Sequence, residues 1–215
     1  MSMSSRLAAT FALLATTACS TLPPASPELF NGRDMAGWEF VTVPASPIDQ
    51  AVQIQPSGVI ALSGQPTGYI ATTASYTDYR LHFEWRWNGK PGNGGALLHI
   101  ASGPKDRAWP LSIQVQTKNG NVGDVLPMAG ASFAEPLTSA PTGPTPIKAH
   151  TAADNEKPVG EWNVCDVVVR GGTIDVTVNG VLQNRVTQAQ PGSGKVGFQF
   201  EGTPYELRAV RLTPL

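Results

Sequence analysis

The stretch Tyr79–Trp87 reads YRLHFEWRW, and its apolar and ionisable side chains alternate without interruption. Side chains of a β-strand point alternately to its two faces, so the large apolar groups lie on one face and the ionisable groups on the other. A helix would not separate the two kinds of side chain at this spacing. The stretch therefore predicts a β-strand with one face in a core and the other in water.

Two later stretches, Leu97–Ile100 and Ser112–Gln116, repeat this alternation with more polar amides and fewer charges. If these strands are neighbours of the first, their polar side chains share one sheet face, which we interpret as the site. The residues on this shared face are Glu84, His99, Gln114 and Gln116. The alternative is that the charges of the first strand only solvate an outer sheet face, where charged residues usually lie.

The composition favours one all-β domain. The chain has 215 residues with 41% hydrophobic and 14% charged residues, and its 22 Gly and 19 Pro suit many short strands joined by tight turns. The formal net charge is -1 and no dense basic stripe is present. A nucleic-acid binder would carry such a stripe, so no nucleic-acid partner is predicted.

The N-terminus predicts export. Arg6 precedes the apolar run Leu7–Ala18, which is too short to span a bilayer, so residues 1–18 form a predicted signal peptide. The run ends at Cys19 in a sequence that resembles the lipobox of bacterial lipoproteins, although Thr16 stands where Leu is usual. Lipidation of Cys19 would anchor the protein to a membrane of the cell envelope or periplasm through a tether, residues 19–27. Ordinary signal cleavage near Ala18 is the alternative.

The cysteines and histidines indicate no metal site. Cys165 lies in an apolar stretch and is expected to be a small buried hydrophobic residue without a role. The three histidines are too scattered to form a zinc-binding pattern. No cofactor is predicted, and the sequence leaves open a divalent metal such as Ca held by carbonyl oxygens.

The rest of the chain continues with short strands. Asn179-Gly180 between alternating runs is a strong hairpin signal, because a type I′ turn needs positive φ at both positions. Residues 134–160 are rich in proline and predict a long irregular segment, either a lid or binding loop or a passive surface loop. Residues 28–215 are therefore predicted to form a single all-β domain, a two-sheet antiparallel sandwich of jelly-roll type.

Several short motifs occur together in an order that resembles one known family, the 3-keto-disaccharide hydrolases. These motifs are Leu29–Gly32 with Gly37-Trp38, Pro110–Gln116 with Gly123-Asp124, Glu156–Asn163, Val178–Gly180, and Gly197–Gln199 with Glu201-Gly202 and Arg208. The resemblance covers residues 28–215. It implies a concanavalin-like jelly roll with a carbohydrate site on its concave sheet, and a carbohydrate or glycoside as the partner.

The resemblance also implies a reaction. A sugar oxidised at C3 has an acidified proton at C2, so a base can remove this proton, the C1 substituent can leave, and addition of water completes a net hydrolysis. Such a reaction needs a base, a stabiliser for the enediolate and an acid for the leaving group. The predicted catalytic residues are Glu84, His99 and Glu201, and the predicted substrate-binding residues are Gln114, Gln116, Lys157 and Arg208.

One departure from the family pattern leaves the activity open. Many members of the family place Glu at the position of Gln114, and a neutral amide cannot act as a base. The leading hypothesis is an exported, lipid-anchored hydrolase or lyase of 3-keto-glycosides. The alternatives are a noncatalytic carbohydrate-binding module on the same fold and an envelope protein whose sheet binds another chain.

Overall fold

The computed structural model describes residues 28–215. The predicted signal peptide, the tether and the lipidation of Cys19 lie outside the described residues. Within residues 28–215, no helix is both long and apolar enough to cross a membrane.

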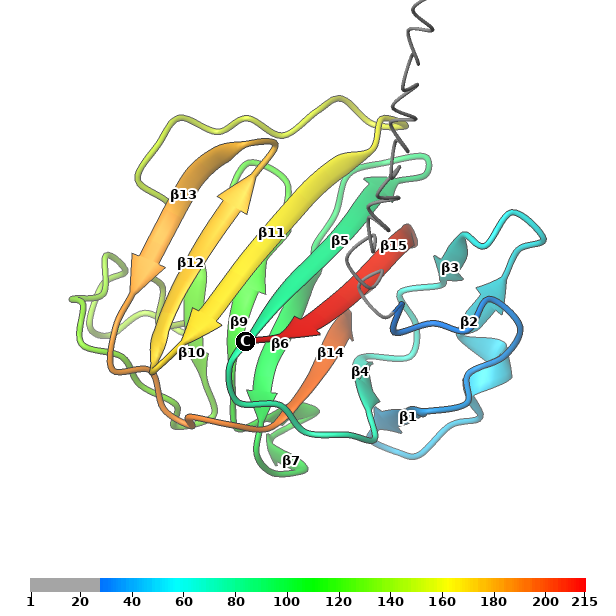
Figure 1. Cartoon of the computed structure of the whole chain (residues 1–215), viewed down its shortest axis with the longest axis horizontal. Coiled ribbons are helices and arrows are strands. Elements are labelled where there is room, and N and C mark those ends of the chain that lie inside the picture. Colours follow the sequence, from blue (N-terminus) through cyan, green and yellow to red (C-terminus); the bar gives the residue numbers. More distant parts are fainter. Residues whose placement is uncertain (1–27) are drawn as a thin grey trace, which may run out of the picture.

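Two antiparallel sheets make up the fold (Figure 1). One sheet has six strands in the order β1 (Trp38–Thr42), β4 (Gly68–Thr72), β14 (Lys195–Phe200), β6 (Gly95–Ile100), β9 (Ser112–Gln116) and β10 (Val125–Met128). The other has seven strands in the order β13 (Val181–Val186), β12 (Thr173–Val178), β11 (Asn163–Arg170), β5 (Tyr79–Trp87), β15 (Tyr205–Pro214), β3 (Ile60–Leu62) and β2 (Val52–Ile54). The predicted all-β, two-sheet antiparallel sandwich is confirmed.

Two small elements complete the described chain. A hairpin of β7 (Pro104–Asp106) and β8 (Trp109–Pro110) follows β6, and a single 3-10 turn, η1 (Ile48–Gln50), precedes β2. The predicted hairpin turn after β12 is present, since Asn179 and Gly180 have φ values of 46° and 82°. Both values lie in the left-handed region that a type I′ turn requires.

The core lies between the two sheets and is built on β5. The inward row of this strand is at most 1% exposed and consists of Tyr79, Leu81, Phe83, Trp85 and Trp87. From the opposite sheet, Phe198 of β14 packs edge-on against Phe83 with ring centroids 5.2 Å apart. Burying an apolar side chain of this size contributes roughly 1.5–3 kcal/mol, so this row is a major part of what holds the two sheets together.

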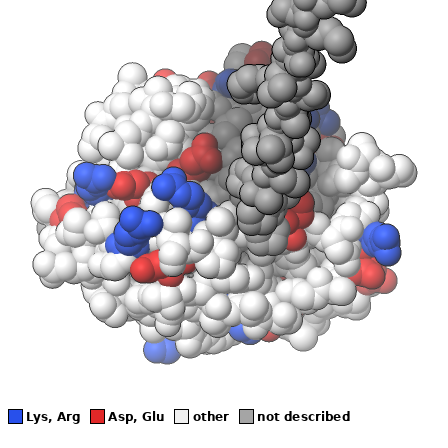
Figure 2. Space-filling model, in the orientation of Figure 1, with Lys and Arg blue, Asp and Glu red and all other residues white. Residues whose placement is uncertain are grey.

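The outward row of β5 lies on the outer face of the seven-stranded sheet. Figure 2 shows positive and negative side chains side by side on this face, and the cross-strand pairs include Glu84–Arg208 at 2.6 Å and His82–Asp166 at 2.7 Å. The expectation that Glu84 shares a face with Gln114 is therefore wrong. The physical reason is that β5 hydrogen-bonds to β11 and β15, whereas β6 and β9 belong to the other sheet.

The predicted alternation of β6 also breaks at His99. This residue has a φ of 52°, and the register with β14 shifts at the same place. As a result, Leu98 packs in the inter-sheet core while Ile100 joins Leu97 in a separate cluster on the outer side. A local irregularity of this kind reorients the residues that follow it.

Candidate functional site

The site is built on the outer face of the six-stranded sheet. In β9, Ile113 and Val115 point into the core, so Gln114 and Gln116 point outward. In β14, Phe198 and Phe200 point inward and Gln199 points outward by the same alternation. Both strands therefore present amide side chains to the same outer face.

Gly95 of β6 allows these amides to meet. Strand β6 lies between β9 and β14, so the side chains of Gln114 and Gln199 must reach across it. Gln114 donates a hydrogen bond from Nε2 to Oε1 of Gln199 at 2.9 Å. A Cβ atom at Gly95 would lie only 2.8 Å from Gln114 Nε2. A larger residue at this position would push the amide aside, which makes Gly95 part of the site although it has no side chain.

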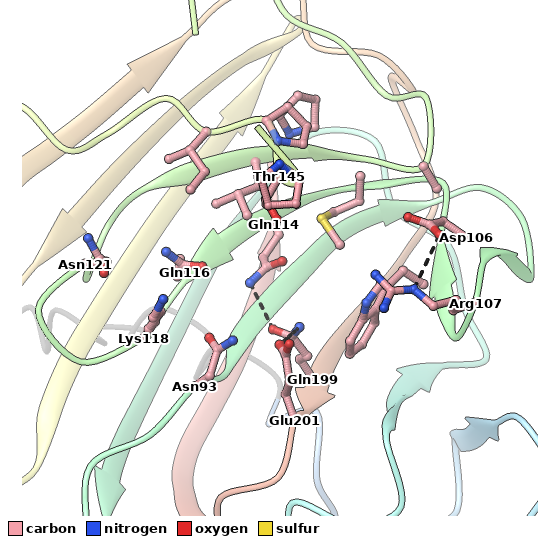
Figure 3. A pocket seen from close by; sticks show the side chains of 18 of the residues that line it. Asn93, Asp106, Arg107, Gln114, Gln116, Lys118, Asn121, Thr145, Gln199 and Glu201 are labelled. Atoms are coloured by element: carbon pink, nitrogen blue, oxygen red, sulfur yellow. Dashed lines mark hydrogen bonds and ion pairs between the residues drawn. The ribbon is translucent and has the colours of Figure 1, made fainter. Parts of the chain in front are cut away.

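Above these amides lies a pocket of about 520 Å³. Figure 3 shows Glu201 between two groups of pocket residues, with Lys118 and Asn121 on one side and Arg107 and Asp106 on the other. A volume of this size is typical of small-molecule sites. The pocket is polar at its floor, as a site for a hydroxyl-rich ligand requires.

Glu201, which directly follows β14, is the partly buried carboxylate of this pocket. It accepts a hydrogen bond of 2.6 Å from Gln199 Nε2, so Gln114, Gln199 and Glu201 form one continuous chain of hydrogen bonds. Burial raises the pKa of the Glu201 carboxyl, and the nearby positive charges of Lys118 and Arg107 partly oppose this shift. A raised pKa brings a carboxyl closer to the range in which it can both accept and donate a proton.

A second chain of polar contacts begins at Gln116. Its Nε2 lies 3.4 Å from Oδ2 of the buried Asp124, whose Oδ1 is 2.7 Å from Nδ1 of His150. Asp124 Oδ1 also accepts the backbone N–H of His150 at 2.8 Å. These contacts hold the Gln116 amide in place at the pocket floor and attach the irregular segment 134–160 to the edge of the sheet.

Two irregular regions form the walls. The turn of the β7–β8 hairpin contributes Arg107, and β8 contributes Trp109. The segment predicted as a lid, binding or passive surface loop contributes residues 144–147. This part of the loop therefore lines the pocket, which a passive surface loop would not do.

Of the residues predicted to form the site, the structure brings together Gln114, Gln116 and Glu201. Glu84 and Arg208 instead pair with each other on the outer face of the other sheet. Near that pair, the guanidinium of Arg208 lies 4.1 Å from the ring centroid of Trp162. Neither Glu84 nor Arg208 lines the pocket.

His99 and Lys157 also lie outside the pocket lining. His99 is 1% exposed, and its two ring nitrogens each lie 2.9 Å from a backbone carbonyl oxygen, those of Pro191 and Thr77. Both nitrogens are thus occupied by the protein itself. The Lys157 ammonium donates to the carbonyl oxygen of Trp162 at 2.9 Å, which fixes the segment leading into β11.

Sequence reasoning missed several pocket residues, namely Asn93, Asp106, Arg107, Lys118, Asn121 and Gln199. The best available signal was Gln199, an uncharged polar side chain between two phenylalanines in a strand pattern like that of β9. Asp106 ends the short strand β7, and the others lie in loops and turns whose path a periodic pattern does not predict. Among residues 28–215, no group of three or more His, Cys, Asp or Glu side chains is placed to hold a metal ion.

The comparison with family models decides the family. The model of the 3-keto-alpha-glucoside-1,2-lyase-like domain matches residues 26–213. The chain belongs to this family. The suspected resemblance to the 3-keto-disaccharide hydrolases is thereby confirmed. No curated protein matches the sequence.

Solved structures similar to this 3-keto-alpha-glucoside-1,2-lyase-like domain share its fold. A proposed glycosyl hydrolase from Parabacteroides distasonis superposes with a TM-score of 0.63 at 20% identity, over 87% of this chain and 92% of that protein. The carbohydrate-binding module CBM66 from Bacillus subtilis superposes with a TM-score of 0.57 at 11% identity, over 83% of this chain and 96% of the module. Together with the family, they support a carbohydrate-related function.

Proposed function

We propose that this protein cleaves glycosides whose sugar is oxidised at C3, and that the reaction takes place in the pocket on the six-stranded sheet. The observation that carries the proposal is the environment of Glu201. A partly buried carboxylate with a raised pKa faces a polar pocket and is oriented by the amide of Gln199. The family match supplies the class of chemistry.

In the proposed reaction, the ketone at C3 acidifies the C2–H bond. The Glu201 carboxylate accepts the C2 proton, and the electron pair of that bond forms an enediolate with the C3 oxygen. The enediolate then expels the C1 oxygen, which takes a proton from Glu201 and leaves as an alcohol. Addition of water across the resulting C1–C2 double bond returns a hydrogen to C2 and a hydroxyl to C1, so the net reaction is hydrolysis.

The positive charges near Glu201 have a defined part in this proposal. Lys118 and Arg107 both line the pocket and both act electrostatically on Glu201. While Glu201 is ionised they favour the carboxylate, and once it has taken the proton they face the negative charge on the sugar. Stabilisation of a developing oxyanion by fixed charges is usually a large contribution to catalysis.

The amides of the floor serve as binding groups in the proposal. Each Gln side chain has one acceptor oxygen and two N–H donors. One N–H of Gln114 is committed to Gln199, and one N–H of Gln116 faces Asp124. Their remaining donors and oxygens are free to bind sugar hydroxyls, with the amide planes already fixed.

The N-terminal expectations belong to the same proposal. An exported protein, anchored through lipid at Cys19 and carrying residues 28–215 as one domain, would meet glycosides in the cell envelope or periplasm. The support for this is the N-terminal sequence pattern, with Arg6, the apolar run and Cys19 in that order.

A noncatalytic carbohydrate-binding module is the second candidate, and Gln114 favours it. The resemblance implies Glu at this position in many relatives, whereas the amide here is 2% exposed and donates to another amide. A module of this kind would bind sugar on the same polar floor and would not need a catalytic base.

Turnover of chromogenic 3-keto-glucosides beside their unoxidised parents separates the two candidates. We expect release of the chromophore from the keto forms only, and loss of this release in Glu201→Gln. Glu84→Gln is the matched control, because it removes an equivalent charge from the other sheet. Folded protein that binds sugars but cleaves neither form would refute the enzyme and favour the binding module.

A further inference from the structure

A second hollow adjoins the pocket on the outer face of the six-stranded sheet. It has a volume of about 570 Å³ and is lined by Val43, Thr67, Arg107, Ala108, Trp109 and Glu201. Three of these residues, Arg107, Trp109 and Glu201, also line the first pocket. Glu201 therefore stands at the junction of two spaces of similar size.

The two spaces differ in chemistry. The floor of the first pocket carries the amides of Gln114, Gln116 and Gln199. No amide side chain lines the second hollow. The residues that it does not share with the first pocket are Val43, Thr67 and Ala108, and Val43 follows the end of β1 with 62% of its surface exposed. The first space suits a ring with many hydroxyls, and the second suits an apolar or aromatic group.

The proposed reaction places a constraint on the substrate. The base acts at C2 and the bond that breaks is at C1, so the scissile bond must lie beside Glu201. The two parts of the substrate then extend away from Glu201 in different directions. The two spaces that meet at Glu201 provide these two directions.

We propose that the first pocket holds the oxidised sugar and that the second hollow holds the leaving group, which is an apolar or aromatic aglycone. This inference rests on the function proposed above and names its substrate class. The Arg107 side chain is 85% exposed, and its Nε lies 3.7 Å from Oδ1 of the likewise exposed Asp106. Because Arg107 lines both spaces, its guanidinium can act on the charge at Glu201 and also contact an aromatic aglycone in the second hollow, an arrangement that such cations favour.

The test compares three 3-keto-glucosides with alcohol leaving groups of similar acidity, carrying methyl, hexyl or cyclohexylmethyl aglycones. We expect kcat/KM to rise by about ten- to a hundredfold from methyl to cyclohexylmethyl, the effect of burying one apolar group of this size. Val43→Asp should lower the ratio of kcat/KM for the cyclohexylmethyl compound to kcat/KM for the methyl compound by about tenfold. Val181→Asp is the matched control, since Val181 is an exposed valine on β13 of the other sheet.

A binding measurement keeps this test separate from the proposed reaction. The methyl NMR signals of Val43 and Ala108 should shift when the unoxidised cyclohexylmethyl glucoside is added, and the methyl glucoside should not shift them. Equal kcat/KM for all three keto compounds, with no selective effect of Val43→Asp, would overturn the aglycone site while the proposed reaction stands. If none of the keto compounds is cleaved, the proposed reaction is refuted, and the NMR shifts then test the aglycone site independently. Shifts of the Val43 and Ala108 signals would support the site, and their absence would overturn it.

Discussion

Replacing Gln199 with Leu tests the proposed role of the hydrogen-bond chain that ends at Glu201. Gln199 is 2% exposed and donates to Glu201 Oε2 at 2.6 Å, so the variant removes one donor from a partly buried carboxylate. A hydrogen bond to a charged group contributes about 1.5–3 kcal/mol. The ionised form of Glu201 loses this stabilisation, and its pKa moves further in the direction in which burial has already raised it.

The expected result is a change in the pH profile. A general base must be ionised to act, so the acidic limb of kcat/KM moves to higher pH in Gln199→Leu. On that limb, kcat/KM falls by roughly one to two orders of magnitude, since each 1.36 kcal/mol corresponds to a tenfold change. Well above the limb, where Glu201 is ionised in both proteins, the difference in kcat/KM should be smaller than on the limb, and what remains of it reflects the Gln114 amide that Gln199 no longer holds.

Gln199→Leu should also lower the free energy of unfolding. Gln114 is 2% exposed and loses the acceptor of its Nε2 group, and leaving a buried donor unpaired costs about 1–3 kcal/mol. Gln183→Leu is the matched control, because Gln183 is a fully buried amide with hydrogen bonds to Ala153 and Asn155, away from the pocket. It should lose stability without a change in the pH profile. A uniform fall of kcat/KM at every pH in Gln199→Leu would refute the role assigned to the chain.

Three further predictions concern the remaining acidic and histidine side chains. Because burial raises the pKa of Glu201 in the folded protein, the contribution of Glu201 to stability is lost as pH rises from its unfolded pKa through its folded pKa. Over this pH window the melting temperature of Glu201→Gln should therefore rise relative to that of the wild type, and a constant difference would contradict this. In the same variant kcat/KM should fall by about 10²–10⁴. Glu84→Gln breaks the ion pair with Arg208 on the other sheet, so the free energy of unfolding measured in urea should fall by about 1 kcal/mol or less. A large loss of turnover would instead indicate a catalytic role for Glu84. His99→Leu removes at least one N–H donor from the two backbone carbonyl oxygens that face the ring. The free energy of unfolding should fall by roughly 1–3 kcal/mol, whereas a folded variant without turnover would argue for a catalytic His99.

Local patterns in the sequence were sufficient to predict the two-sheet architecture. The alternation in Tyr79–Trp87 predicted a half-buried strand, and β5 has this arrangement with its apolar row fully enclosed. Asn179-Gly180 predicted a hairpin turn, and both residues have positive φ. These features depend on steric preferences and on side-chain direction within a few residues, so they can be read without knowledge of the rest of the chain.

The site was only partly predictable, because periodicity shows which residues of one strand share a face and does not show which strands are neighbours. Glu84 and Gln114 have similar local patterns, yet β5 pairs with β11 and β15 while β9 pairs with β6 and β10. Gln114 meets Gln199, 85 residues further along the chain, only because β6 places Gly95 between them.

The sequence by itself therefore determined the strands, their turns, the sandwich and the family of this protein. The tertiary structure alone decided which polar rows meet, since strand order depends on how the apolar rows of distant segments pack in a common core. It placed Glu201 in a pocket between Lys118 and Arg107, paired Glu84 with Arg208 on the opposite sheet, and enclosed His99 among backbone carbonyls. Each of these outcomes arises from contacts between segments far apart in the chain, and such contacts leave no periodic signal in the sequence.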